Sequence, residues 1–142
     1  MDAEISRDGL GTDEERTGLA MVELSNGMVR LYKDLFGRGP TKARTNYAGP
    51  DIIVSTLENS LTRPERNMAA AGDHERLRDL RTYFQYQAED EFRAVVERVT
   101  GRTVRAFVSG MDTRQDVASE VFYLAPRVEA VAPSQPGNPA LR

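Results

Sequence analysis

Cysteine and tryptophan are absent from this sequence, and histidine occurs once in 142 residues, at His74. The absence of cysteine excludes disulfides, thiolate metal sites and thiol nucleophiles. A metal-binding or catalytic role for His74 would require partner residues, yet its neighbours are Asp73 and Glu75 at an expected helix start. We therefore interpret His74 as an exposed residue of a first helical turn, and we expect neither a metal site nor a cofactor.

Long hydrophobic runs are also missing, since no apolar stretch approaches the roughly 18–20 residues that a membrane span needs. The N-terminal segment is rich in aspartate and glutamate, whereas a signal peptide begins with basic residues. The sequence thus predicts a cytoplasmic protein, which would serve any membrane system as a soluble partner and without a span of its own.

An excess of positive charge is absent as well, because the net charge is −3 and the pI is about 5.3. The arginines between Arg76 and Arg105 are interleaved with Glu75, Asp79 and Glu97. These acidic residues break the continuous basic stripe with which proteins bind a phosphate backbone. We therefore expect no nucleic-acid partner.

The first strong pattern in the chain is helical. Thr12 and Glu15 form a capping box, in which each side chain accepts the backbone N–H of the other residue. Gly37 and Pro40 end the pattern, which predicts a helix over 13–36. Its apolar stripe is broader than one face of a small sheet needs, so the helix either packs against a second copy in a homodimer or is a covered core helix. The stripe consists of Met21, Leu24, Met28, Leu31 and Leu35.

Further along, two moderately alternating runs over 42–48 and 51–58 flank a Gly-Pro turn and predict a β-hairpin. A second capping box at Thr62 begins a short helix that ends by Gly72, and a long helix should run from Asp73 to Gly101. Its aromatic residues Tyr83 and Tyr86 lie off the expected core row, and they mark either a partner interface or a contact within the domain. The expected core row consists of Leu77, Leu80, Phe84, Ala88, Phe92, Val95 and Val99.

Two more strands, over 103–109 and 117–124, complete the expected domain of residues 12–124. We expect disorder at 1–11 and in the proline-rich tail at 125–142. The predicted order is α-β-β-α-α-β-β. This order gives an α+β fold with a four-stranded antiparallel sheet, built from two hairpins, and with helices packed on one face.

The segment Gly37–Arg44 is basic and free of acidic residues. Arg38, Lys42 and Arg44, together with backbone N–H groups, are candidates to hold a small anion such as bicarbonate, phosphate or a carboxylate. The alternative interpretation is a helix stop, a sharp turn and a solvated edge strand whose charges discourage edge pairing.

Catalytic constellations are not evident. No Ser/His/Asp set, carboxylate pair or metal-ligand spacing appears, and Asp112 and Asp116 in one loop do not make a site by themselves. We expect a protein that is not an enzyme.

Four segments, taken in order, resemble a known bacterial family: Gly37–Lys42, Asp51–Val54, Leu61–Arg66 and Val99–Val104. On these segments the chain is similar to the MpsC family, a component of a Na⁺-translocating membrane-potential-generating system, over about 100 residues from the first helix to Leu124. The resemblance implies an accessory or regulatory protein that supports cation translocation or bicarbonate (inorganic-carbon) uptake through contacts with a membrane transporter subunit. It carries over no catalytic residues. The alternative function is a small-anion or small-ligand sensor that uses Gly37–Arg44.

Overall fold

The computed structural model describes residues 11–127, which form an α+β fold with one four-stranded antiparallel sheet, as predicted. The observed order is α-β-β-α-α-α-β-β, one helix more than expected. The predictions made for 1–10 and 128–142 lie outside the described residues. The elements are α1 Asp13–Phe36, β1 Lys42–Tyr47, β2 Ile52–Glu58, α2 Arg63–Ala70, α3 His74–Gln87, α4 Glu89–Thr100, β3 Val104–Asp112 and β4 Val117–Leu124.

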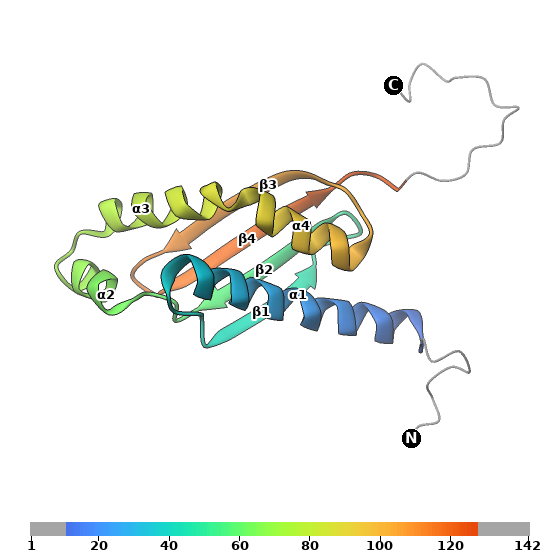
Figure 1. The fold of residues 1–142 in the computed structure, drawn as a ribbon, viewed down its shortest axis with the longest axis horizontal. Coiled ribbons are helices and arrows are strands. Elements are labelled where there is room, and N and C mark those ends of the chain that lie inside the picture. Colours follow the sequence, from blue (N-terminus) through green and yellow to red (C-terminus); the bar gives the residue numbers. More distant parts are fainter. Residues whose placement is uncertain (1–10, 128–142) are drawn as a thin grey trace, which may run out of the picture.

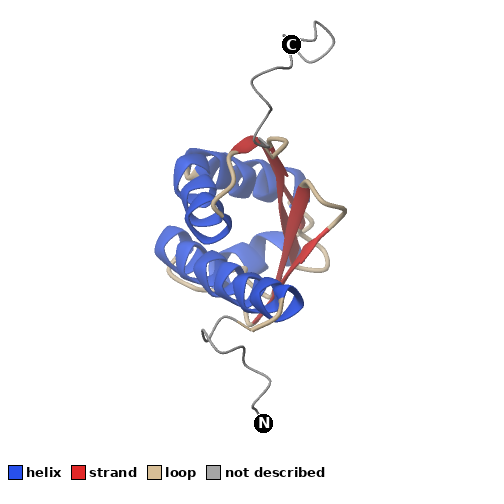
Figure 2. Ribbon diagram, turned by 90° about the vertical axis from the view of Figure 1, so that its right-hand side faces the viewer, coloured by secondary structure: helices blue, strands red, loops and turns tan. Residues whose placement is uncertain are grey.

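The sheet has the strand order β1-β2-β4-β3, so the second hairpin is added to the first through its later strand. Figure 1 shows α1, α3 and α4 lying over the same side of the sheet, with α2 at one end. Figure 2 shows the consequence, because all helices lie on one side of the sheet and its other face carries none. The prediction of helices on one face is confirmed.

Local sequence signals explain the first helix. The capping box between Thr12 and Glu15 is present, and Gly37 ends the helix with a left-handed φ of 77°, which glycine adopts without steric cost. The predicted range 13–36 coincides with α1. Its inner side buries Leu24, Met28 and Tyr32 completely.

The predicted single long helix is wrong, because the chain bends at Ala88 and divides into α3 and α4. The Ala88 N–H is shared between the carbonyls of Phe84 and Gln85, at 3.2 and 3.3 Å. Packing explains the bend, since α3 lies along β3 while α4 turns to pack against α1. No glycine or proline lies at this position, so the bend could not be predicted from the local sequence.

The core row expected on this long helix is also partly wrong. Leu80 and Phe84 are more than 40% exposed, whereas Arg81 and Gln85, one residue further along in each case, are fully buried. Helix α3 is therefore turned so that a cation and an amide face the sheet.

Helix α1 crosses α4 at Gly27, which is buried. A Cβ atom placed there would lie 2.8 Å from Cγ1 of Val95, closer than side chains pack. Gly27 has little helix propensity, and its place inside a long helix is explained by this close approach.

Candidate functional site

A row of polar residues crosses the helix-covered face of the sheet. Thr45, Ser55, Glu120 and Ser109 lie opposite one another on β1, β2, β4 and β3 in turn. All four are buried, in a layer that is otherwise apolar. Because buried polar groups require partners, this row and the residues above it define the candidate site.

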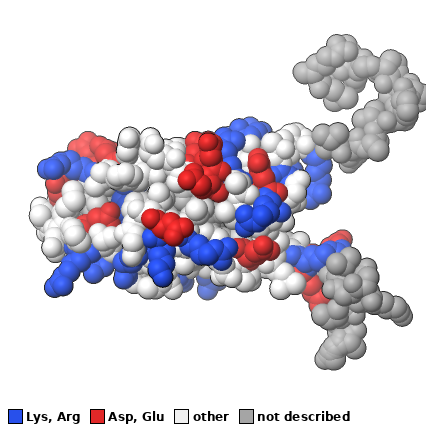
Figure 3. Space-filling model, in the orientation of Figure 1, with Lys and Arg blue, Asp and Glu red and all other residues white. Residues whose placement is uncertain are grey.

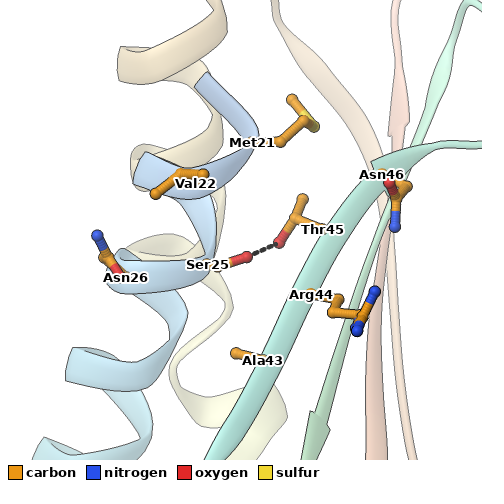
Figure 4. A pocket seen from close by; sticks show the side chains of 8 residues that line it. All are labelled: Met21, Val22, Ser25, Asn26, Ala43, Arg44, Thr45 and Asn46. Atoms are coloured by element: carbon orange, nitrogen blue, oxygen red, sulfur yellow. Dashed lines mark hydrogen bonds between the residues drawn. The ribbon is translucent and has the colours of Figure 1, made fainter. Parts of the chain in front are cut away.

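The first half of the row is a chain of hydroxyl groups. Ser25 of α1 bonds Thr45 at 2.8 Å, and Thr45 bonds Ser55 at 2.8 Å. Figure 4 shows the Ser25–Thr45 bond at the floor of a groove between α1 and β1, with a volume of about 330 Å³. Val22, on the rim of this groove, is exposed.

The second half of the row centres on the carboxyl group of Glu120. The Tyr32 hydroxyl of α1 donates to Glu120 Oε2. The Gln85 amide of α3 also donates to this oxygen, at 3.1 Å, and to the Ser109 hydroxyl at 2.5 Å. Three side chains from α1, α3 and β3 thus meet around one carboxyl group that no water reaches.

Burial raises the pKa of Glu120 to about 7, although hydrogen bonds from Ser109 and Tyr32 and the charge of Arg81 act in the opposite direction. Burial, together with the neighbouring Glu120, also raises the pKa of the Tyr32 phenol well above its ordinary value. The carboxyl group therefore changes its protonation state near neutral pH.

Protonation also fits the hydrogen-bond inventory. Oε1 of Glu120 and Oε1 of Gln85 are both buried and have no hydrogen-bond partner among the described residues. Two acceptors cannot satisfy one another, but a protonated carboxyl group brings a donor into this cluster. The buried surroundings of Glu120 thus favour its neutral form at low pH.

Arg81 lies beside this cluster and is itself fully buried. It donates to Glu65 from Nε at 2.9 Å and from Nη2 at 3.1 Å, and to the Ser60 carbonyl at 2.5 Å. Its guanidinium also lies 3.6 Å from the centre of the Phe36 ring. Burial alone would raise the pKa of Glu65, but the bonds from Arg81 and Thr62 lower it on balance.

The predicted anion-binding residues do not converge on one open site. Arg38 donates to the Asn59 carbonyl at 3.0 Å, and Lys42 lies 3.8 Å from Glu58. Arg44 projects from the helix-free face of β1 and has no hydrogen-bond or ion-pair partner within residues 11–127. The basic segment is thus an edge strand with one unpaired cation.

The predicted interface residues divide into two groups. Met21, Leu24 and Met28 are buried in the chain's own core, and Leu31 and Leu35 pack against that core. The structure therefore places the α1 stripe inside the domain, which is the second of the two alternatives. Tyr83 is exposed, while Tyr86 uses its hydroxyl to accept the Ser109 N–H at 3.0 Å at the edge of β3.

The two loop carboxylates have structural partners. Asp112 accepts the N–H groups of Arg114 and Gln115, both at 2.9 Å. Asp116 accepts the N–H of Ser60 at 2.9 Å and so connects the β3–β4 turn to the start of α2. Within residues 11–127, no three His, Asp or Glu side chains are grouped closely enough to hold a metal ion.

Sequence reasoning missed the Glu120 cluster. Side chains alternate between the two faces of a strand, so Glu120 shares a face with Ala118 and Phe122. This parity was visible in the sequence and would have placed a carboxyl group in the core. The helix residues Arg81 and Gln85 gave no comparable signal, because Leu80 and Phe84 offered a more apolar row.

Comparison with known proteins assigns the chain at the level of a family. Residues 17–126 match the family described as the Na⁺-translocating membrane potential-generating system (MpsC). The chain belongs to the MpsC family. No curated protein and no solved structure matches it. The match spans every helix and strand described above, apart from the first turn of α1.

The description of the family names a membrane system, and one structural finding concerns the membrane. None of the helices in the described part of the chain is long and apolar enough to cross a membrane. Figure 3 shows basic and acidic side chains interspersed over the face that carries the helices.

Proposed function

We propose that this chain is an accessory or regulatory protein of a Na⁺-translocating, membrane-potential-generating system, and that it acts through protein contacts without catalysis. The observation that carries the proposal is the match to the MpsC family over residues 17–126. Its partner would be a membrane subunit of that system, met at the cytoplasmic side of the membrane. We also propose that the same system supplies the cell with bicarbonate.

The distribution of polar groups supports a contact role. The polar cluster around Glu120 is sealed beneath three helices, so its carboxyl group holds a proton but meets no substrate from solution. The uncovered face of the sheet, by contrast, presents apolar side chains to the outside. We propose that the chain works as a homodimer, since two-fold dimers are by far the commonest oligomers of soluble proteins.

A deletion strain tests the functional assignment. Membrane potential and growth would be measured in air and in elevated CO₂, with and without added Na⁺, and in a strain that carries the gene on a plasmid. The proposal predicts a lower potential and poor growth in air, both restored by the plasmid, with growth also restored by CO₂. Unchanged potential and growth under all gases, in a strain without a second copy of the gene, would contradict it.

Two observations support the alternative, an anion sensor. Arg44 is unpaired, and the Nε atom of Arg38 is buried without a partner among the described residues. Thermal unfolding in bicarbonate, phosphate and acetate tests this function, since a ligand that binds the folded state raises the unfolding temperature. A rise in one anion that Arg44→Gln abolishes would favour the sensor. Equal temperatures in all salts at matched ionic strength would exclude it.

A further inference from the structure

The face of the sheet that no helix covers carries an apolar patch on β2, β4 and β3. Along β2 and β4 the residues of this face alternate with buried ones, and none of the patch belongs to the core or packs against it. Thr56, Glu58 and Ser119 form a polar end of the same face. A contiguous apolar patch on a sheet face that lies in water marks an interaction surface, because such a face is normally polar throughout. The patch consists of Ile52, Val54, Val108, Val121 and Tyr123.

The middle of this face is flat. The strand register places Thr56, Ser119 and Gly110 side by side on β2, β4 and β3. A Cβ atom at Gly110 would meet nothing within 4 Å, so the space above it is open. Small side chains allow another sheet to approach to the usual spacing of about 10 Å between packed sheets.

One cross-strand row of this face carries opposite charges at its two ends. Lys42 and Arg44 lie on the β1 edge, and Asp112 lies on the β3 edge in the same row as Lys42. Lys42 is 3.8 Å from Glu58 of this row, whereas Arg44 is unpaired within the described residues and Asp112 is exposed. The cation of β3, Arg105, lies over the Tyr123 ring at the opposite end of the strand. A row that is basic at one end and acidic at the other is complementary to itself after a two-fold rotation.

We propose that two copies of the chain pack these uncovered sheet faces together, around a two-fold axis that runs along the strands. This axis places β1 of one copy over β3 of the other, so that Lys42 and Arg44 meet Asp112. It also places β2 over β4, so that Val54 meets Val121. A two-fold axis perpendicular to the strands is disfavoured, because it would bring Arg44 of one copy close to Arg44 of the other copy without a counter-ion.

The inference deepens the homodimer of the proposed function and rests on it. Four strands of six to nine residues give a face roughly 19 Å wide and 25 Å long. Two such faces cover roughly 950 Å² in total, which is below the lower end of the range for stable interfaces, about 1,200 Å². We therefore expect a dimer that dissociates at micromolar concentration.

Sedimentation velocity of the full chain, from low to high micromolar concentration, is the first test. The wild-type chain should shift from monomer to dimer, and Val121→Glu should remain monomeric. Val22→Glu is the matched control, since Val22 is an exposed apolar residue on α1, away from the sheet face. Circular dichroism would verify that both variants are folded.

The outcomes separate the surface from the homodimer. A wild-type chain that is monomeric at every concentration overturns both the homodimer and this surface. The role in the membrane system is tested separately, by the deletion strain. A dimer that Val22→Glu disrupts and folded Val121→Glu does not overturns this surface alone and moves the interface to the α1 groove.

Cross-linking tests the axis independently of any disruptive charge. The chain has no cysteine, so Val54→Cys and Val121→Cys can be prepared as separate proteins and mixed under mild oxidation. The proposed axis predicts that the mixed disulfide forms several times faster than either homodisulfide. Equal rates for all pairs, or a rate no higher than that of a Val22→Cys control, would overturn the proposed packing.

Discussion

The two faces of the sheet each carry a feature that is uncommon for such a face. The face beneath the helices is mostly apolar, but a polar row crosses it from Thr45 to Ser109, with the carboxyl group of Glu120 near its middle. The face without helices has a polar end, but its other end carries an apolar patch on β2, β4 and β3. A sheet that served only as a scaffold would normally have its polar residues outside and its apolar residues inside.

This difference separates two kinds of contribution. The inner polar row makes most of its hydrogen bonds within the chain, although Oε1 of Glu120 has no partner among the described residues, so removal of one member should cost stability. The outer apolar patch makes few contacts within the chain, among them that of Arg105 with the Tyr123 ring, so its side chains contribute little to folding. Substitutions on the inner face should therefore affect stability, and those on the outer face should affect assembly.

The largest effect is expected when the buried cation is removed from the inner face. Arg81→Ala removes the guanidinium donors of Glu65 and of the Ser60 carbonyl, and loss of one member of a buried ion pair costs about 3–5 kcal/mol. Chemical denaturation measures this loss. Arg78→Ala, an exposed arginine on the same helix, is the control and should change the unfolding free energy little. Equal small losses in both variants would contradict the buried ion pair.

The second prediction concerns pH and Glu120. Because its pKa rises to about 7 in the folded state, the folded chain binds more protons than the unfolded chain between about pH 4.5 and 7. The unfolding free energy should therefore fall as the pH rises through this range, by up to about 3 kcal/mol.

Glu120→Gln keeps the shape of the side chain but cannot ionise, so it should remove this decrease and be more stable than the wild type above pH 7. Denaturation curves at about pH 5 and about pH 8, which lie below and above the pKa of Glu120, measure the difference. The same decrease in both proteins would show that another group is responsible.

The third prediction concerns the helices that seal the inner face. Gly27→Ala pushes α1 away from Val95 and should cost about 1–3 kcal/mol, as overpacking does. Gly18→Ala on the same helix meets no neighbour and should stabilise the chain by up to about 1 kcal/mol. Thermal unfolding compares the two. A gain in stability at both positions would contradict the close crossing of α1 and α4.

The smallest effect is expected on the outer face. Val108→Thr places a hydroxyl group on a side chain that is half exposed, and should change the unfolding free energy by less than about 0.5 kcal/mol in the monomer. Val104→Thr makes the same change on the buried side of the same strand and should cost about 1–3 kcal/mol. Denaturation at concentrations below dimer formation measures both. Similar losses of unfolding free energy at the two positions would contradict the proposed difference between the two faces of the sheet.

Much of the fold could be predicted because its signals are local. The capping boxes at Thr12 and Thr62 and the left-handed glycines at Gly37 and Gly101 are present at the predicted positions. The bend at Ala88 could not be predicted, because it follows from the packing of α3 and α4 against different elements and not from a residue that breaks helices.

The candidate site was largely hidden from sequence reasoning. Arg81 and Gln85 are long polar residues on an amphipathic helix, where solvent exposure is the ordinary outcome. Their burial depends on Glu65 and Glu120, which lie on other elements, and such partners become visible only when the chain is folded. Only Glu120 could have been placed in the core from the alternation along β4.

If the chain acts through its uncovered sheet face, a charge placed on that face should abolish its role in the cell. Membrane potential would be measured in the deletion strain complemented with the wild type, Val121→Glu or Val22→Glu at equal protein levels. We predict that the wild type and Val22→Glu restore the potential and that Val121→Glu does not. Full restoration by Val121→Glu would show that the contact surface lies elsewhere on the chain.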